Sequence, residues 1–398
     1  GFKKVEDKNY VVVGRTAPEG YINYGRLIAE SSDRVPKVEV DSKETWIQIY
    51  TSGTTGTPKG VVRSHESYIL SYLIEAFEFG FSEKDYGMIV MPLYHVNSTF
   101  YGPLFLYIGA SLYVGRDKGF DPVELLSVMS REKITFTSLI PTHYAMILNV
   151  PGEVRKKYDV SSVRKLLCSS APVRGHVKRE ILKCFPNVEL YEAYGSTEAG
   201  LVTILRPEDQ TRKLGSMGRE CLGTDVIKLL DEKGNEVSIG EVGELYSRGP
   251  MMFDEYYKDS EKTKRSFRDD FFTAGDLVKR DEEGYYYMVE RKDNMIITGG
   301  EHVYPSEVEE IILRHPKVFD VAVIGVPDDK WGEAVKAVVI LKEGETTTSE
   351  EIIEWCRGRM AGFKKPKSVD FVSDSEMPRT TTGKILHRKL REKYSQQL

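Results

Sequence analysis

A stretch near residue 51 combines hydroxyl side chains, glycines and a lysine in a spacing suited to binding phosphate. The stretch consists of Thr51, Ser52, Gly53, Thr54, Thr55, Gly56, Thr57, Pro58, Lys59 and Gly60, and it follows an apolar run that predicts a strand. Backbone N–H groups and hydroxyls can surround phosphate oxygens, and glycine lets the backbone approach them closely. Lys59 adds a positive charge. We therefore predict a phosphate-binding loop.

This loop differs from the P-loop of nucleoside triphosphatases. The P-loop motif is GxxxxGK followed by Ser or Thr, and it runs into a helix. Here Pro58 precedes Lys59 and Gly60 follows it, so the hydroxyl that binds Mg2+ is missing and the proline hinders the turn. We reject the P-loop interpretation, and a Ser/Thr/Gly loop without a ligand remains the alternative.

A second polar motif, Tyr191–Gly200, contains Thr197 and Glu198 side by side. Mg2+ takes one or two carboxylates together with phosphate oxygens, so one glutamate beside a threonine is chemically sufficient. The run Val188–Glu192 predicts a strand, which places the motif at the carboxyl end of a sheet, where α/β proteins bind ligands. Taken alone, Glu198 would be interpreted as a solvated surface residue.

Apolar runs alternate with helical patterns between residues 41 and 206, and these elements must position both motifs. The predicted strands are Trp46–Tyr50, Ile134–Ile140, Val163–Cys168 and Val188–Glu192, and the predicted helices are Pro141–Leu148 and Val173–Cys184. This alternation indicates an α/β sheet covered by helices. After Gly215, strands over Asp225–Leu230 and Glu244–Arg248 flank a turn at Asp231–Glu236, which indicates a small antiparallel, β-barrel-like subdomain.

A charged stretch, Glu290–Asn294, precedes a last unit of different texture. Ser306 with Glu309, and Thr348 with Glu351, have the spacing of capping boxes and predict two helix starts. The predicted strands of this unit are Val321–Val326, Ala334–Leu341 and Ser368–Val372. We expect a large domain over residues 1–291 and a small C-terminal α+β domain over residues 292–398, with the boundary near Asp293.

The composition excludes several classes of protein. The chain has 398 residues, 40% of them hydrophobic, and a net charge of -5. It can therefore bury large cores, and it has no basic surface for nucleic acid. No apolar stretch approaches the roughly 20 residues that span a bilayer. The four cysteines lie far apart without metal-binding spacing, which favours a reduced, cytoplasmic protein.

The two polar motifs resemble the signature loops of the adenylate-forming (ANL) superfamily, and in particular those of its AMP-forming acyl- and aryl-CoA synthetases. The resemblance implies that the loop from Thr51 to Lys59 holds the β- and γ-phosphates of ATP. It also implies that Tyr194, with Gly195 and Ser196, stacks on adenine. By the same resemblance, Thr197 contacts the α-phosphate and Glu198 holds Mg2+.

Two further segments resemble motifs of the same family. Pro92–Asn97 is similar to its PLxH segment, which implies that His95 lies near the carboxylate being activated; the alternative is a histidine that caps a loop. The run Ser169, Ser170, Ala171 and Pro172 is similar to the GGAP segment that lines the adenine and acyl pockets, with serines in place of both glycines. No FDxS-like acidic anchor for a substrate amine is present, which disfavours an amino acid substrate.

The motifs that follow keep the family's order along the chain. Phe271–Asp276 resembles the TGD motif with Ala274 in place of threonine, so Asp276 is expected to bind both ribose hydroxyls. Glu290–Asp293 resembles the hinge, with Arg291 near the ribose and Asp293 as the pivot; a charged surface linker is the alternative. Thr298–Pro305 and Pro378–Ile385 resemble the family's last two motifs. The resemblance implies that Gly299 and Gly300 line the CoA channel and that Lys384 is the catalytic lysine; the alternatives are an ordinary turn and a solvated lysine in a basic tail.

The resemblance implies an enzyme that uses ATP, Mg2+ and coenzyme A to convert a fatty or aromatic carboxylic acid to its thioester through an acyl-adenylate. The alternatives are a ligase that loads a carrier protein or has an oxidative second step, and a catalytically impaired nucleotide-binding fragment. Relatives carry a large portion before the phosphate loop, whereas fifty residues precede Thr51 here. We expect most of that portion to be missing, and a homo-oligomer stays open.

Overall fold

The computed structural model describes residues 9–51, 58–115, 119–169, 173, 175–380, 383 and 385–395. It contains two compact units, residues 1–41 and residues 42–398. The first unit is small. Its strands β1 (Val11–Val12) and β2 (Ile22–Asn23) pair in parallel, and helix α1 (Tyr24–Glu30) begins at Asn23, whose side chain accepts from the N–H of Arg26 at 3.0 Å.

The second unit is built on a seven-stranded sheet with the order β11-β10-β9-β8-β7-β5-β6. The strands are β5 (Tyr86–Ile89), β6 (Ser111–Val114), β7 (Phe136–Leu139), β8 (Lys165–Cys168), β9 (Glu189–Ser196), β10 (Gly200–Leu205) and β11 (Arg219–Glu220). Strands β5 to β9 run parallel, and β10 and β11 are antiparallel additions. The predicted α/β sheet is confirmed.

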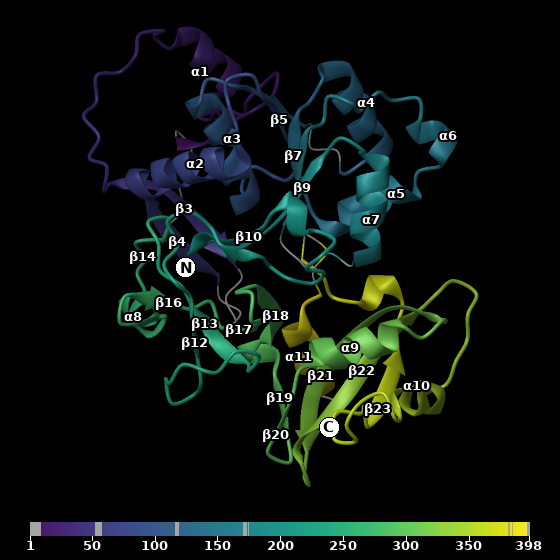
Figure 1. Cartoon of the computed structure of the whole chain (residues 1–398). Helices are drawn as coiled ribbons and strands as arrows, with labels where there is room; N and C mark the ends of the chain where they lie inside the picture. The colour runs from purple at the N-terminus through teal and green to yellow at the C-terminus, as the bar shows by residue number, and fades with distance from the viewer. Residues whose placement is uncertain are drawn as a thin grey trace. The chain divides into compact units, whose positions relative to one another are not determined.

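Helices cover both faces of this sheet (Figure 1). They are α2 (His65–Phe79) and α3 (Val96–Tyr107) on one face, and α4 (Pro122–Glu132), α5 (Pro141–Asn149) and α7 (Gly175–Cys184) on the other, with α6 (Gly152–Arg155) as a short connection. Phe79, Phe105 and Phe136 centre the first core, and Leu126 and Tyr144 belong to the second. The sheet is therefore buried on both sides, as parallel sheets are.

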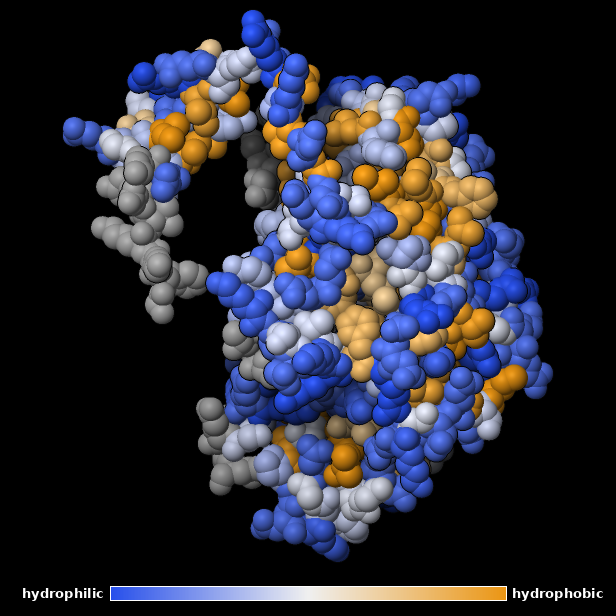
Figure 2. Space-filling view, turned by 90° about the vertical axis from the view of Figure 1, so that its left-hand side faces the viewer, coloured by the Kyte–Doolittle hydropathy of each residue, from blue (hydrophilic) through white to orange (hydrophobic). Residues whose placement is uncertain are grey.

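Helix α2 has apolar side chains on two faces. The buried face carries Tyr68, Tyr72 and Phe79, and the outer face exposes Ile69, Leu73 and Phe77. Figure 2 views the molecule from the left-hand side of Figure 1 and shows apolar patches between hydrophilic ones on that side. The outer stripe of α2 thus leaves three large apolar side chains exposed.

Two smaller antiparallel sheets flank the large one. The first combines β3 (Thr45–Thr51), β4 (Lys59–Ser64) and β14 (Glu255–Tyr256). The second has the order β12-β13-β17-β18, formed by β12 (Lys228–Leu230), β13 (Gly243–Tyr246), β17 (Asp276–Arg280) and β18 (Tyr286–Arg291), and next to it lie α8 (Ser260–Arg265), β15 (Phe267–Arg268) and β16 (Phe271–Phe272). Val61, Phe272 and Tyr286 share one core, so the two sheets pack together.

The C-terminal part contains its own five-stranded sheet, in which β20, β19, β22 and β21 lie in order and β23 pairs with β22. The elements are β19 (Ile296–Thr298), β20 (Glu301–Val303), α9 (Pro305–Leu313), β21 (Val318–Asp328), β22 (Gly332–Leu341), α10 (Ser349–Cys356), β23 (Ser368–Phe371) and α11 (His387–Ser395). Alternate residues of β21 enter different cores, Val323 with α9 and α10 and Ala322 with α11. The predicted α+β architecture is present, and the predicted boundary at residues 291/292 stays a prediction.

The structure corrects one of the two predicted capping boxes. Helix α10 begins as predicted, because the N–H of Glu351 donates to Thr348 Oγ1 at 3.2 Å. Helix α9 instead begins at Pro305, and proline suits a first helical position. The hydroxyl of Ser306 donates to the carbonyl of Val289 at 2.5 Å. Ser306 therefore ties α9 to β18 rather than capping its own helix.

Candidate active site

Three side chains converge where β17 and β18 face β9. Asp276 and Arg291 are paired across the two antiparallel strands, and Arg291 Nη1 lies 3.0 Å from Asp276 Oδ1. The hydroxyl of Tyr194 donates to Asp276 Oδ2 at 2.6 Å. Arg291 also donates to the backbone carbonyl of Ala274 at 2.8 Å, a contact that does not depend on the side chain at position 274. We call these three residues the Asp276 cluster.

One carboxylate oxygen of Asp276, Oδ1, has a charged neighbour in Arg291 but no well-formed hydrogen bond within the described ranges. The residue is only 4% exposed, and among the described residues no hydrogen bond of acceptable geometry reaches its Oδ1. Burial, followed by the neighbouring Asp276 carboxylate, raises the pKa of Tyr194 well above its usual range, so this hydroxyl remains a donor. In the part of the chain that the structure describes, Oδ1 is thus held by an ion pair without a well-formed hydrogen bond, and a carboxylate oxygen in this state has acceptor capacity left for a ligand hydroxyl.

A second cluster joins the predicted phosphate loop to the turn between β9 and β10. Lys59 Nζ lies 2.6 Å from Glu198 Oε1. The hydroxyl of Tyr256 donates to the same oxygen at 2.9 Å and accepts from Lys59 at 2.9 Å. Burial and the Glu198 carboxylate raise the pKa of Tyr256. Glu198 is thus a buried, paired carboxylate, and the interpretation of this residue as surface-exposed is wrong.

The ends of the predicted phosphate loop meet in the structure. Thr51 pairs with Lys59 across β3 and β4, and the hydroxyl of Thr51 is buried without a hydrogen-bond partner in the described parts of the chain. The remaining predicted loop residues lie outside the described residues; they are Ser52, Gly53, Thr54, Thr55 and Gly56. Ser170, Ala171, Pro172 and Lys384 also lie outside them.

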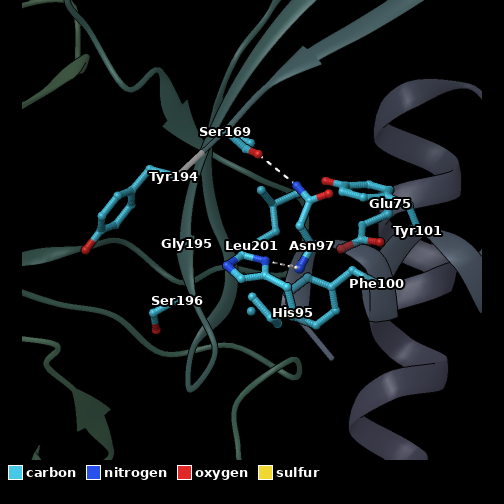
Figure 3. Close-up of a pocket in the computed structure, with 13 residues that line it drawn as sticks. Glu75, His95, Asn97, Phe100, Tyr101, Ser169, Tyr194, Gly195, Ser196 and Leu201 are labelled. Carbon is cyan, nitrogen blue, oxygen red and sulfur yellow. Dashed lines mark hydrogen bonds between the residues drawn. The ribbon is translucent and has the colours of Figure 1, made fainter. Parts of the chain in front are cut away.

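His95 both caps a helix and lines a pocket. Its Nδ1 accepts from the N–H of Asn97 at 3.2 Å, at the start of α3. Burial lowers the pKa of His95, so the ring is neutral near pH 7 and its proton is on Nε2. Asn97 in turn donates to Ser138 at 2.7 Å and to Ser169 at 2.8 Å. These hydrogen bonds hold Asn97, and Asn97 in turn holds the His95 ring at the start of α3. Part of the network is drawn in Figure 3.

The pocket beside His95 has about 490 Å³ of empty space, part of it open to solvent. One side is formed by His95 and the end of β9, including Tyr194, Gly195 and Ser196. The other side is formed by helices α2 and α3 and carries Glu75, Phe100 and Tyr101 (Figure 3). The pocket therefore connects the predicted adenine residues with an aromatic wall that the sequence analysis did not identify.

One described residue of the predicted Lys384 motif, Gly383, lies close to the start of α5. A Cβ atom added to Gly383 would lie 3.4 Å from Thr142 Oγ1, at the start of α5. Gly299 and Gly300 have positive φ angles of 60° and 84° and form the turn between β19 and β20. That hairpin lies at the far end of the C-terminal sheet in Figure 1. The structure thus presents one of the two predicted C-terminal segments to the large sheet.

The predicted hinge is held by contacts from the C-terminal helices. Arg391 of α11 donates to the carbonyl of Asp293 and to the side chain of Asn294, the latter at 3.1 Å. Glu290 accepts from the N–H of Ser306 at 3.0 Å.

Neither Tyr256 nor Glu75 was found from the sequence. For Glu75 a signal existed, since it occupies the apolar stripe of α2 with Tyr68, Tyr72 and Phe79.

No group of three His, Cys, Asp or Glu side chains gathers as a metal site in the described ranges. Within the same ranges, no helix is long and apolar enough to cross a membrane.

Comparison with known proteins identifies the family. Residues 3–257 match the AMP-binding enzyme family, and residues 307–384 match the AMP-binding enzyme C-terminal domain. A feruloyl-CoA synthase from Amycolatopsis sp is 34% identical over 92% of this chain and 73% of that protein. The long-chain-fatty-acid–CoA ligase FadD13 from Mycobacterium tuberculosis is 34% identical over 93% of this chain and 71% of that protein.

A solved structure agrees with both the family and the fold. The crystal structure of ATP-bound MatB from Rhodopseudomonas palustris superposes with a TM-score of 0.84 at 33% identity, covering 93% of this chain and 72% of MatB. The predicted family resemblance and fold class are confirmed. This chain belongs to the AMP-binding enzyme family, among the acyl-CoA synthetases of the adenylate-forming superfamily.

Proposed function

We propose that this protein activates a carboxylic acid with ATP, releases pyrophosphate, and transfers the acyl group from the acyl-adenylate to coenzyme A. The observation that carries the proposal is the Asp276 cluster. Its buried Oδ1 lies beside Arg291 but receives no well-formed hydrogen bond from the described residues, and it is an acceptor suited to a ribose hydroxyl. The cluster borders a pocket that ends on an aromatic wall, as a site for a nucleotide and an acid requires.

The nucleotide would bind along the end of β9. Asp276 accepts from the ribose hydroxyls, and Arg291 holds that carboxylate in place through their 3.0 Å contact. The hydrogen bond from Tyr194 to Asp276 fixes the tyrosine ring beside the pocket, so that adenine can stack on it. Gly195 and Ser196, with Ser170, Ala171 and Pro172, complete the nucleotide pocket.

The phosphates would bind between Lys59 and Glu198. The residues from Thr51 to Gly56 surround the β- and γ-phosphates, and Lys59 neutralises part of their charge. One buried carboxylate fits Mg2+, because this ion takes only one or two carboxylates together with phosphate oxygens. Glu198 is then the residue that holds the ion. When bound, Mg2+ supplies positive charge to the phosphate oxygens.

In the first half-reaction, a carboxylate oxygen of the acid attacks the α-phosphorus and the bond to pyrophosphate breaks. Charge accumulates on the phosphate oxygens in the transition state, so positioned cations and donors are what catalysis requires. Thr197 contacts the α-phosphate and Lys384 approaches it from the C-terminal part. The position of Gly383 beside Thr142 supports this approach. His95 borders the space for the carboxylate.

In the second half-reaction, the thiolate of coenzyme A attacks the acyl carbon and AMP leaves. Lys384 has no task in this step and occupies the route by which the thiol approaches. A rotation about Asp293 would remove Lys384 and bring the Gly299–Gly300 turn to the same site, which is hinge closure used twice. Gly383 lies beside Thr142 of α5, whereas the Gly299–Gly300 turn joins β19 and β20, and this arrangement supports the proposal.

Acid-dependent exchange of labelled pyrophosphate into ATP tests the first step, and thioester formation with coenzyme A tests the second. We expect both. Exchange without a thioester would favour loading of a carrier protein. ATP binding without exchange for any acid would overturn the proposal and favour a catalytically impaired nucleotide-binding protein.

A further inference from the structure

In the pocket beside His95, the side formed by α2 and α3 contains a carboxyl group without a hydrogen-bond partner among the described residues. Glu75 has no exposed surface, and neither of its oxygens forms a hydrogen bond within the parts of the chain that the structure describes. Buried polar side chains in proteins are almost always satisfied, and those at functional sites are the common exceptions. The substrate is therefore a candidate for the missing partner.

The nearest cation does not neutralise Glu75 directly. Arg63 attracts the carboxylate, yet in the described chain no ion pair joins the two residues. The guanidinium instead donates to Ser71 Oγ at 3.2 Å and to the carbonyl of Met251. It also lies 4.6 Å from the centre of the Tyr68 ring. The partners of Arg63 are thus other groups, and Glu75 is left facing the pocket.

The protonation of Glu75 limits the ligands it can bind. Burial raises the pKa of Glu75 to about 8, although Arg63 opposes the shift. Near pH 7 the group is therefore mostly a neutral carboxylic acid, which both donates and accepts one hydrogen bond. A hydroxyl matches it in both roles. A substrate with an apolar tail would leave both Glu75 oxygens without a hydrogen bond. A second carboxylate on the substrate would face a negative charge whenever Glu75 is ionised.

The rest of the wall is aromatic. Phe100 and Tyr101 of α3 lie beside Glu75 (Figure 3) and line the same pocket. Flat rings pack well against aromatic walls. His95 and the end of β9 lie on the opposite side, where the proposed function places the carboxylate being activated.

We propose that Glu75 determines substrate specificity by binding a hydroxyl at the far end of an aromatic carboxylic acid. This inference rests on the proposed function, because it assumes that the acid enters the pocket with its carboxylate toward His95. The substrate class is then a hydroxylated aromatic acid rather than a plain fatty acid.

The test compares 4-hydroxycinnamic acid with cinnamic acid, which differ by one hydroxyl. Pyrophosphate exchange gives kcat/KM for each acid, and the ratio of the two values is the measurement. For the parent protein we expect a ratio of at least about tenfold, because a site built to bind a hydroxyl rejects the analogue that lacks it. Glu75→Leu should lose most of this preference, and Glu75→Gln, whose amide also donates and accepts, should keep part of it.

Glu78→Gln provides a matched control on the same helix. Glu78 is also buried, but it pairs with Arg206 at 2.7 Å and does not line this pocket. The substitution should leave the ratio of the two acids unchanged. If Glu78→Gln changed this ratio as much as Glu75→Leu does, the preference would result from general loosening of α2, and the inference would be overturned.

The pH dependence of this ratio gives a second test, which does not require the Glu75→Leu variant to fold. The groups facing Glu75 are Arg63, Tyr68, Tyr72, Tyr101 and Cys221. Burial raises the pKa of the three tyrosines, and it raises the pKa of Cys221 to about 12. Burial lowers the pKa of His95. Between pH 7 and pH 9 the parent's preference should change as Glu75 loses its proton, and that of Glu75→Gln should not.

The outcomes separate the two proposals. If no acid, including octanoic and benzoic acids, supports pyrophosphate exchange, the proposed function fails and this inference fails with it. If acids are activated but the ratio is near one in the parent, or is the same in Glu75→Leu or at every pH, only the role of Glu75 is overturned.

Discussion

The chain forms the same trio of side chains twice, once at the candidate site and once away from it. Asp276 lies between Tyr194 and Arg291, and Asp209 lies between Tyr285 and Arg212. The second trio is saturated: Tyr285 donates to Asp209 Oδ2 at 2.5 Å, and Arg212 donates to Oδ1 at 2.7 Å.

The difference lies in the geometry of one contact. Both oxygens of Asp209 accept hydrogen bonds, whereas Asp276 Oδ1 is 3.0 Å from Arg291 Nη1 but receives no hydrogen bond of acceptable geometry within the described structure. Arg212 also pairs with Glu283 at 2.5 Å, so the second trio extends into a surface network. Residue types alone therefore do not distinguish a structural cluster from a binding cluster. The distinction comes from which polar atoms the fold leaves unsatisfied.

The largest effect should come from removing the charge that acts in the transition state. Lys384→Ala should lower pyrophosphate exchange by about a hundredfold or more, the usual loss for such a contact. The affinity for ATP, measured by equilibrium binding, should stay close to that of the parent because the Asp276 cluster is intact. Thioester formation from pre-made acyl-adenylate should survive, and an equal loss in both half-reactions would refute this division of labour.

Fixing the predicted hinge should abolish one half-reaction. Asp293→Pro locks φ near roughly -65° and removes a donor, next to the Arg291 of the Asp276 cluster. We expect exchange to be retained and thioester formation to be lost. A melting temperature equal to the parent's would exclude simple unfolding. A well-folded variant that runs both half-reactions at parental rates would contradict the rotation model.

Replacing Asp276 and replacing Asp209 by alanine should have different effects. Asp276→Ala should raise the KM for ATP by roughly tenfold to a hundredfold, since a hydrogen bond to a charged group contributes about 1.5–3 kcal/mol. Asp209→Ala should lower the melting temperature and leave the KM for ATP unchanged. Replacing ATP with 2′-deoxy-ATP should cost the Asp276→Ala variant less than the parent. An equal cost in both would show that Asp276 does not bind that hydroxyl.

The tyrosines give a smaller version of the same comparison. Tyr194→Phe removes the hydroxyl that orients Asp276 but keeps the ring, so the KM for ATP should rise by only a few-fold. Tyr285→Phe leaves the buried Asp209 with one donor fewer and should lower the melting temperature instead. If Tyr194→Phe were destabilising and kinetically silent, both trios would be structural and the comparison would fail.

Much of the fold was predictable because the signals are local. The strands around Trp46–Tyr50 and Ile134–Ile140 and the helix after Pro141 follow from apolar runs and a proline at the helix start. The end of β9 was not predictable. Tyr194, Gly195 and Ser196 have loop-like composition, but they continue the strand because β10 pairs with them, and that pairing is not local in the pattern.

The candidate site was predictable in its family motifs and not in its packing. Ser306 has the local signature of a cap, yet Pro305 begins the helix and Val289 takes the serine hydroxyl. Tyr256 lies far along the sequence from Lys59 and joins it only through sheet pairing of β14 with β4. Such contacts depend on three-dimensional arrangement, which residue spacing does not encode.

Glu75 gives the last and smallest expected effect, on stability rather than on rate. Its pKa in the folded protein is about 8, above the ordinary value of 4.5. Between these values the unfolded chain releases the proton while the folded protein keeps it. The free energy of unfolding should therefore fall as pH rises, by at most about 1.4 kcal/mol per pH unit, and level off above pH 8.

Glu75→Gln is neutral at every pH and removes this contribution. Its melting temperature relative to the parent should therefore increase between pH 5 and pH 8. Glu78→Gln loses an ion pair instead and should melt below the parent at both values. A bound acid whose hydroxyl satisfies Glu75 should reduce the advantage of Glu75→Gln, because the parent then gains a partner that only the folded state offers. If the two proteins differ equally at pH 5 and pH 8, then the fold does not raise the pKa of Glu75, and this prediction is refuted.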